Sequence, residues 1–123
     1  MRFWYLIIGS IAGGFARYFV AGEIYKRTGT GFPWGTLIVN VTGCLLIGLF
    51  NSLAEEKFIL SPEQRILMMT GFCGAYTTFS TFILETSGLL RDGEFFLGTA
   101  NVAVSVLAGY AFFRLGAFLV KII

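Results

Sequence analysis

The stretch GFCGAYTTFSTF (residues 71–82) decides the fold, because it places small and hydroxyl-bearing residues in the middle of an apolar segment. Two glycines, Gly71 and Gly74, are followed by four Thr or Ser residues and two Phe residues. Gly and Thr are poor helix formers, and broken backbone survives at membrane depth only where it is buried in protein or lines a cavity. The stretch therefore predicts a break in a membrane helix. Carbonyls freed by such a break are oxygen ligands of the kind that a hard cation prefers.

The composition of the whole chain is that of a membrane protein. Of its 123 residues, 56% are hydrophobic and only 13% are charged, whereas a soluble domain carries about 25% charged residues. One span needs roughly 20 mostly apolar residues, and four apolar blocks fill most of the chain: residues 3–21, 32–54, 66–90 and 95–120. We therefore predict an all-α integral membrane protein with four transmembrane helices and a break in the third, as a single domain over residues 1–123. No room remains for a soluble catalytic domain, so an enzyme is not expected.

Two local signals bear on the helix boundaries. Ser61, Pro62 and Gln64 form the pattern of a capping box with Pro at the first helical position, which predicts a helix start. Arg2 precedes an apolar stretch, as in a secretory signal peptide, but the stretch continues past residue 18 without a convincing small-residue cleavage site. We therefore expect the first block to be retained as a transmembrane helix.

The charged residues exclude several classes of protein. Nine Lys and Arg and seven Asp and Glu are scattered without a run of like sign, so neither a nucleic-acid-binding patch nor a polybasic lipid-binding tract is expected. Histidine is absent, which removes the commonest metal ligand and the usual proton shuttle near neutral pH.

Lys and Arg are nearly balanced between the two sides of the membrane. With four spans, the termini and the loop between the second and third spans share one side. Because cytoplasmic loops normally carry an excess of Lys and Arg, this balance predicts insertion in both orientations, which invites an antiparallel two-fold homodimer. The alternative is that one or two central charges fix a single orientation. The charges on the first side are Arg2, Lys57, Arg65 and Lys121, and those opposite are Lys26, Arg27 and Arg91.

Small residues are interpreted as packing positions. Cys44 and Cys73 stand apart inside apolar stretches and behave there as small buried apolar residues. Gly9 and Gly13, four residues apart, allow membrane helices to approach closely. That approach serves a dimer interface and packing within one chain equally well.

Polar side chains at membrane depth are costly and usually face the protein interior or a water-filled path. Thr36 and Asn40 are four apart on the second span and share one face, with Gly43 just beyond. Hydroxyls and amides donate hydrogen bonds without carrying charge, so such a stripe is a candidate to hydrate a small anion. The alternative is hydrogen bonding between helices, worth about 1 kcal/mol per contact. A second stripe of the same kind lies on the fourth span: Asn101, Ser105 and Gly109.

Two further features suit an anion. Phe79 and Phe82 are three apart and lie along one face of any helix that continues after the break, and the electropositive edges of their rings offer weak positive potential. Packing or lipid contact is the alternative for each ring. Arg17, near one end of the first block, is the candidate fixed charge that draws anions into a vestibule. Its alternative is snorkelling to the lipid headgroups.

The acidic residues argue against proton coupling. They lie in or beside loops, apart from Glu85, which falls towards the end of the third block. A proton-coupled exporter needs a titratable group near the substrate path, and no Asp, Glu or His occupies the middle of a block. The sequence therefore favours a passive pathway for a small anion.

Three motifs carry a family resemblance. They are Gly13-Gly14-x-x-Arg17-Tyr18, Pro33-Trp34-Gly35-Thr36-Leu37-x-Val39-Asn40-x-x-Gly43, and Gly71-x-x-Gly74-x-x-Thr77-Thr78-Phe79-Ser80-Thr81-Phe82. Together they are similar to the Fluc (CrcB) family of fluoride channels, and the likeness covers all four spans. The resemblance implies an antiparallel, dual-topology homodimer in the cell (inner) membrane, with two pores that pass fluoride out of the cell down its gradient.

The resemblance also implies roles for individual residues. Phe79 and Phe82 match the pore phenylalanines of the family, and Thr36 and Asn40 match its second-span polar pair. It further implies a central, structural sodium ion held by backbone carbonyls of both subunits. The matching positions are Gly74 and Thr77 for sodium, and Asn101, Ser105 and Gly109 for the fourth-span pore face. The implied partners are fluoride, membrane lipid and a second copy of the chain, with no nucleic acid.

Two other classes are compatible with four short spans. A small proton-coupled multidrug exporter shares the dual topology but needs a membrane-embedded Glu in the first span, and none precedes Glu23 here. A non-conducting membrane assembly subunit explains the glycines but leaves the hydroxyl-rich break without a purpose. The fluoride channel is therefore the primary prediction.

Overall fold

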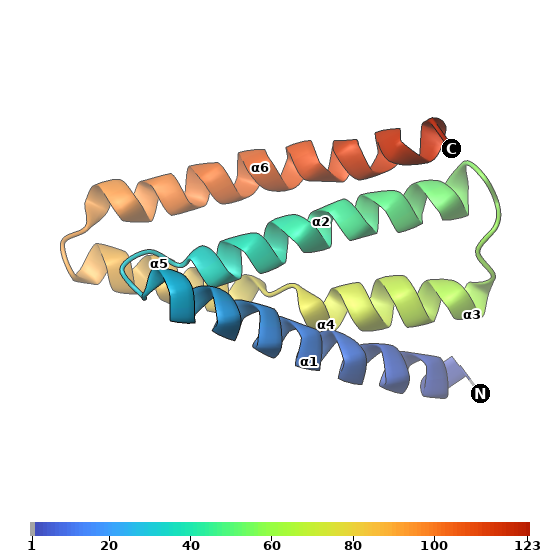
Figure 1. The fold of residues 1–123 in the computed structure, drawn as a ribbon, viewed down its shortest axis with the longest axis horizontal. Coiled ribbons are helices and arrows are strands. Elements are labelled where there is room, and N and C mark those ends of the chain that lie inside the picture. Colours follow the sequence, from blue (N-terminus) through green and yellow to red (C-terminus); the bar gives the residue numbers. More distant parts are fainter. Residues whose placement is uncertain (1) are drawn as a thin grey trace.

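Four long helical segments run side by side along the longest axis of the molecule (Figure 1). The computed structural model describes residues 2–123. The segments are α1 (Arg2–Thr28), α2 (Trp34–Glu55), an interrupted third segment (Pro62–Arg91) and α6 (Phe95–Lys121). Each is long and apolar enough to cross a membrane, which confirms the all-α expectation with four such helices. Both termini and the connection that follows α2 lie at one end of the molecule, as an even number of spans requires (Figure 1).

The third segment consists of consecutive pieces separated by one interruption. Its pieces are α3 (Pro62–Arg65), the π-helix η1 (Ile66–Cys73), α4 (Gly74–Tyr76) and α5 (Phe79–Arg91). Figure 1 shows the chain leaving helical form between α4 and α5. The break predicted from residues 71–82 is therefore confirmed. The π-helix before it is an addition that the sequence pattern did not predict, and such helices occur frequently at functional sites.

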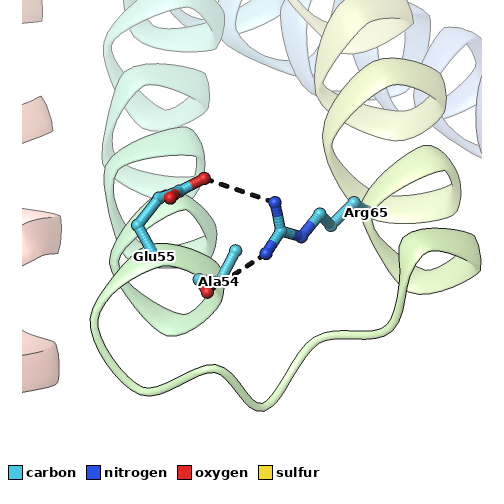
Figure 2. A network of polar contacts seen from close by, with 3 residues as sticks. All are labelled: Ala54, Glu55 and Arg65. Atoms are coloured by element: carbon cyan, nitrogen blue, oxygen red, sulfur yellow. Dashed lines mark hydrogen bonds and ion pairs between the residues drawn. The ribbon is translucent and has the colours of Figure 1, made fainter.

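Side chains on both sides of the preceding loop anchor the start of the third segment. The Ser61 hydroxyl accepts a hydrogen bond from the Gln64 amide at 3.1 Å, and Gln64 Oε1 accepts one from the Ser61 amide at 2.9 Å, which confirms the predicted capping box. Arg65 reaches back to α2, where it donates to the Glu55 carboxylate at 3.3 Å and to the Ala54 carbonyl at 3.2 Å (Figure 2). Carbonyls at a helix C-terminus lack partners within the helix, so Arg65 both caps α2 and ties it to α3.

Helix α1 extends beyond the apolar block that predicts it. The block ends at residue 21, whereas the helix continues to Thr28. Its last turns are polar and carry local bonds, including an ion pair between Lys26 and Glu23 at 3.1 Å. Hydropathy marks where a helix can face lipid, and backbone hydrogen bonding does not stop there. Arg17 therefore lies well inside α1, which corrects its expected position near one end.

Glycines allow the helices of one chain to approach closely. A Cβ at Gly9 would clash with the carbonyl oxygen of Leu67, and Gly13 lies against the η1 backbone in the same way. Between α2 and α6, Gly48 and Gly116 each face a backbone carbonyl of the opposite helix. The sequence left open whether glycines such as Gly9 and Gly13 pack within a chain or between chains. Within the described chain, these four serve packing inside it.

Few large apolar side chains are enclosed by the four segments. Val39 and Val120 are fully buried, whereas many Phe, Ile and Leu side chains lie on the outside. Apolar surface of this extent is a liability in water and is what lipid or a partner subunit covers. Cys73 is buried and Cys44 half-buried, both as free thiols, in agreement with their interpretation as small packing residues.

Candidate ion pathway at the break

Two extended residues form the break. Thr77 has φ −86° and ψ 159°, and Thr78 has φ −149° and ψ 120°. The Thr78 hydroxyl then caps α5 by accepting a hydrogen bond from the Thr81 amide at 3.3 Å. A capping Thr at this position stabilises the new helix start, so the hydroxyl residues of the motif both end one helix and begin the next.

Asn40 on α2 holds the extended backbone in place. Its Nδ2 donates to the Thr78 carbonyl at 3.0 Å, and its Oδ1 accepts from the Thr78 amide at 2.8 Å. One amide side chain thus pairs with both backbone polar groups of Thr78. The Thr78 amide has no helical acceptor, and the Thr78 carbonyl, at the N-cap of α5, also accepts the first bond of that helix. An amide can make four hydrogen bonds, so Asn40 keeps one N–H and one lone pair beyond this clamp.

Two backbone carbonyls at the break have lost their helical donors. In an unbroken α-helix, the Gly74 carbonyl would accept from the Thr78 amide, but that amide bonds to Asn40. The Thr77 carbonyl would accept from the Thr81 amide, which instead bonds to the Thr78 hydroxyl. Gly74 and Thr77 also line one cavity, of about 340 Å³, together with Asn40. The break therefore places two carbonyls without helical donors beside a cavity, the donor type that the sequence reasoning named for a cation.

Arg17 contacts the backbone at the same break. Its Nε donates to the Ala75 carbonyl at 3.2 Å, another carbonyl whose helical donor would have come from beyond the interruption. The side chain is half-buried in the middle of α1. Arg17 thus does not snorkel towards the end of the helix. It lines a cavity of about 560 Å³ that Thr36 and Thr78 also line.

Thr36 contacts Tyr25, which in turn bonds to Glu85, and neither of these two residues was predicted as a site residue from the sequence. The Tyr25 hydroxyl accepts from the Thr36 amide at 3.4 Å, lies 3.3 Å from the Thr36 hydroxyl, and donates to Glu85 Oε2 at 2.7 Å. Tyr25 lies beyond the first apolar block, and Glu85 was placed near a span end. The signal that could have found Tyr25 is its position eight residues after Arg17, on the same face of a helix that continues through polar turns.

The two phenylalanines after the break lie close to each other. The ring centroids of Phe79 and Phe82 are 5.8 Å apart, with an angle of 47° between the ring planes. Their environments differ, because Phe82 is 8% exposed and Phe79 is 74% exposed. Phe79 lines the same cavity as Asn40, whereas Phe82 is enclosed by the protein.

The fourth-span stripe forms a network between α5 and α6. Asn101 is buried, and its Nδ2 donates to the Thr86 hydroxyl at 2.9 Å. Its Oδ1 accepts from the Ser105 hydroxyl at 3.3 Å. Gly109, two turns further, faces the Cys44 sulfur on α2. Within one chain, the stripe therefore makes the helix-to-helix bonds that the sequence reasoning weighed as the alternative to lining a path.

Two neighbouring cavities bring together part of the predicted set, whereas Phe82, Asn101 and Ser105 line neither of them. Arg17 and Thr36 line the larger cavity, and the smaller one has Asn40, Phe79 and the two break carbonyls in its wall. Thr78 lines both. The arrangement offers N–H and O–H donors, a positive charge on Arg17 without a carboxylate partner among the described residues, and carbonyls freed by the break. It is suited to binding and passing a small ion.

Comparison with known proteins agrees with this chemistry. The family model described as CrcB-like protein, Camphor Resistance (CrcB), matches residues 4–117. The fluoride-specific ion channel FluC of Methylocella silvestris is 45% identical over 109 residues, covering 87% of this chain and 83% of that protein. The protein of the same name from Chlorobaculum tepidum is 47% identical over 114 residues, with 93% and 90% covered, and that from Solibacter usitatus is 42% identical over 121 residues, with 98% and 99% covered. The chain belongs to the CrcB family.

Proposed function

We propose that the chain is a fluoride channel of the cell (inner) membrane, which lets fluoride leave the cell down its gradient and so reduces its toxicity. The observation that carries this proposal is the Asn40 clamp on the break, beside a cavity that Thr77, Thr78 and Phe79 line. The names of the relatives support it, because each describes a fluoride-specific ion channel.

The donor set fits fluoride. Fluoride is small and tightly hydrated, so a path through the membrane must replace its water with hydrogen-bond donors, since an unsatisfied ion in hydrocarbon is prohibitively costly. The Thr78 hydroxyl, whose oxygen accepts from the Thr81 amide, and the remaining N–H of Asn40 are such donors, and the edges of Phe79 and Phe82 add weak positive potential. Several modest sites, rather than one deep site, also allow the ion to leave, as conduction requires.

A structural sodium ion belongs to the same proposal. The Gly74 and Thr77 carbonyls of two antiparallel chains would supply four oxygen ligands at a two-fold axis. The residues described around the cavity that these carbonyls line include no Asp or Glu, so a monovalent ion suits the site better than a divalent one. Such an ion would brace the break, while the channel passes fluoride without coupling to it.

The antiparallel homodimer is proposed on two grounds. The Lys and Arg residues are nearly balanced between the two sides of the membrane, which favours insertion in both orientations. The four-oxygen sodium site also needs two carbonyls from each of two chains. The rival exporter has no support in α1, whose one glutamate, Glu23, is paired with Lys26 in the polar last turns.

Fluoride efflux from liposomes tests the proposal. Purified protein is reconstituted into liposomes loaded with potassium fluoride or potassium chloride, valinomycin is added, and the released halide is followed with ion-selective electrodes. We expect rapid fluoride release and chloride release no faster than from protein-free liposomes. Fluoride release at the protein-free rate would refute the channel, and equal release of both halides would refute its specificity.

A further inference from the structure

Tyr25 and Glu85 join α1 to α5 in a contact to which the roles above assign no function. The Tyr25 hydroxyl donates to Glu85 Oε2 at 2.7 Å, the shortest side-chain hydrogen bond at the candidate pathway. The same hydroxyl accepts from the Thr36 amide at 3.4 Å. The Tyr25 hydroxyl has one proton, and that proton goes to the Glu85 carboxylate. The Thr36 hydroxyl is therefore the donor in its 3.3 Å contact with the Tyr25 hydroxyl. The phenol thus links three helices.

The carboxylate depends on this one donor. Glu85 Oε1 is buried and has no hydrogen-bond partner within residues 2–123. An ionised carboxylate has about four acceptor positions, and a buried charge is costly unless it is hydrogen-bonded. Tyr25 is therefore the group that keeps the Glu85 charge tolerable in its present position.

The pair stands where two cavities meet. Tyr25 and Glu85 line the cavity of about 560 Å³ that leads to Thr78 at the break. They also line a cavity of about 320 Å³ on the side of the loop before α2, together with Pro33 and Asp92. The larger cavity is also lined by Arg17, Lys26 and Glu23, and Glu23 forms an ion pair with Lys26 at 3.1 Å. Among the described residues, Arg17 is therefore the cation at this cavity that has no carboxylate partner.

We propose that Tyr25 is a positioning residue of the fluoride pathway, which holds the Glu85 carboxylate so that it does not neutralise Arg17, which lines the same cavity. This inference rests on the proposed function. A carboxylate that loses its donor pairs most strongly with a nearby ammonium or guanidinium group. Arg17 is the candidate in the shared cavity, because Lys26 is already paired with Glu23. Once paired with Glu85, Arg17 no longer attracts an entering anion.

The test begins with Tyr25→Phe, which removes one hydroxyl and keeps the ring that packs over Gly35. We expect fluoride efflux in the liposome assay to fall about tenfold, the rate equivalent of one charge-assisted hydrogen bond. Because the effect is electrostatic, the defect should shrink when an impermeant salt raises the ionic strength. The matched control is Tyr5→Phe on the same helix at its opposite end, which should keep the wild-type rate.

A second comparison, made in protein that carries Glu85→Gln, separates a positioning role of Tyr25 from a packing role. An amide carries no charge to neutralise Arg17, so Tyr25→Phe added to Glu85→Gln should change efflux less than about twofold relative to Glu85→Gln alone. This comparison also applies if Tyr25→Phe by itself fails to assemble. An equal loss in both backgrounds, or a wild-type rate for Tyr25→Phe, overturns the positioning role. Wild-type protein that releases no fluoride would instead refute the channel itself.

Discussion

Asn40 is the residue on which the geometry of the break depends, because one side chain pairs both backbone groups of Thr78. We predict that Asn40→Ala leaves the Thr78 amide unpaired and removes one of two donors from the Thr78 carbonyl, at a cost of roughly 1 to 3 kcal/mol, and lowers fluoride efflux about tenfold or more. Asn40→Asp keeps an acceptor for the Thr78 amide but offers the carbonyl no donor and adds a negative charge. Its stability should lie between wild type and Asn40→Ala, while its efflux falls furthest.

Liposome efflux and the melting temperature of the purified protein measure these two effects separately. Asn51→Ala serves as the control, since Asn51 lies on the same helix about three turns further along. It should change neither quantity appreciably. If Asn40→Ala matches wild type in both, the clamp has no part in conduction.

Substitutions of the two phenylalanines after the break test whether their aromatic rings contribute to conduction. Replacing Phe79 or Phe82 by Ile keeps an apolar side chain but removes the electropositive ring edge, so fluoride efflux should fall at least about tenfold while the assembled protein persists in size-exclusion chromatography. Phe96→Ile is the control, because Phe96 is largely exposed, as Phe79 is, but lies on α6. Wild-type efflux in both pathway variants would assign these rings to packing alone.

At the scale of the element, the interrupted third segment is held by its own caps and by α2, and its free carbonyls predict dependence on sodium. A ligand that binds the assembled state stabilises it by mass action, so exchanging sodium for a bulky organic cation such as N-methylglucamine should lower both the stability of the assembled protein and the fluoride efflux. Readdition of sodium should restore them. Thr77→Val should keep the sodium response, because the proposed ligand is the Thr77 carbonyl. Unchanged stability and efflux after complete exchange would eliminate the site.

At the scale of the whole molecule, the nearly balanced charges predict two orientations in one membrane. Both termini lie at the same end (Figure 1), so a reporter fused to the C-terminus should be found on both sides of the membrane in the same cells. Adding two Lys residues to the connection after α2 should place the reporter on one side of the membrane in nearly all molecules, because Lys and Arg in short loops set orientation. A wild-type fusion found on one side alone would contradict dual insertion and the antiparallel dimer.

The sequence by itself determined the features that depend on local chemistry. Four apolar blocks predicted four helices, residues 71–82 predicted the break, and Ser61 with Gln64 predicted the cap, because hydropathy, helix propensity and capping act over a few neighbouring residues. The sequence also singled out Asn40, since a polar side chain at membrane depth needs a polar partner; its role in a pathway stays a prediction.

Only the tertiary structure decided which partners those polar groups meet. Arg17 bonds to the Ala75 carbonyl, Asn40 to the Thr78 backbone, and Tyr25 to Glu85, each across a gap of more than 30 positions in the chain. Such pairs arise from how whole helices pack. The spacing of polar residues along one helix does not say which residue of another helix each of them contacts. The polar end of α1 was missed for a related reason: hydropathy reports contact with lipid, whereas the backbone continues its hydrogen bonding beyond the lipid-facing block.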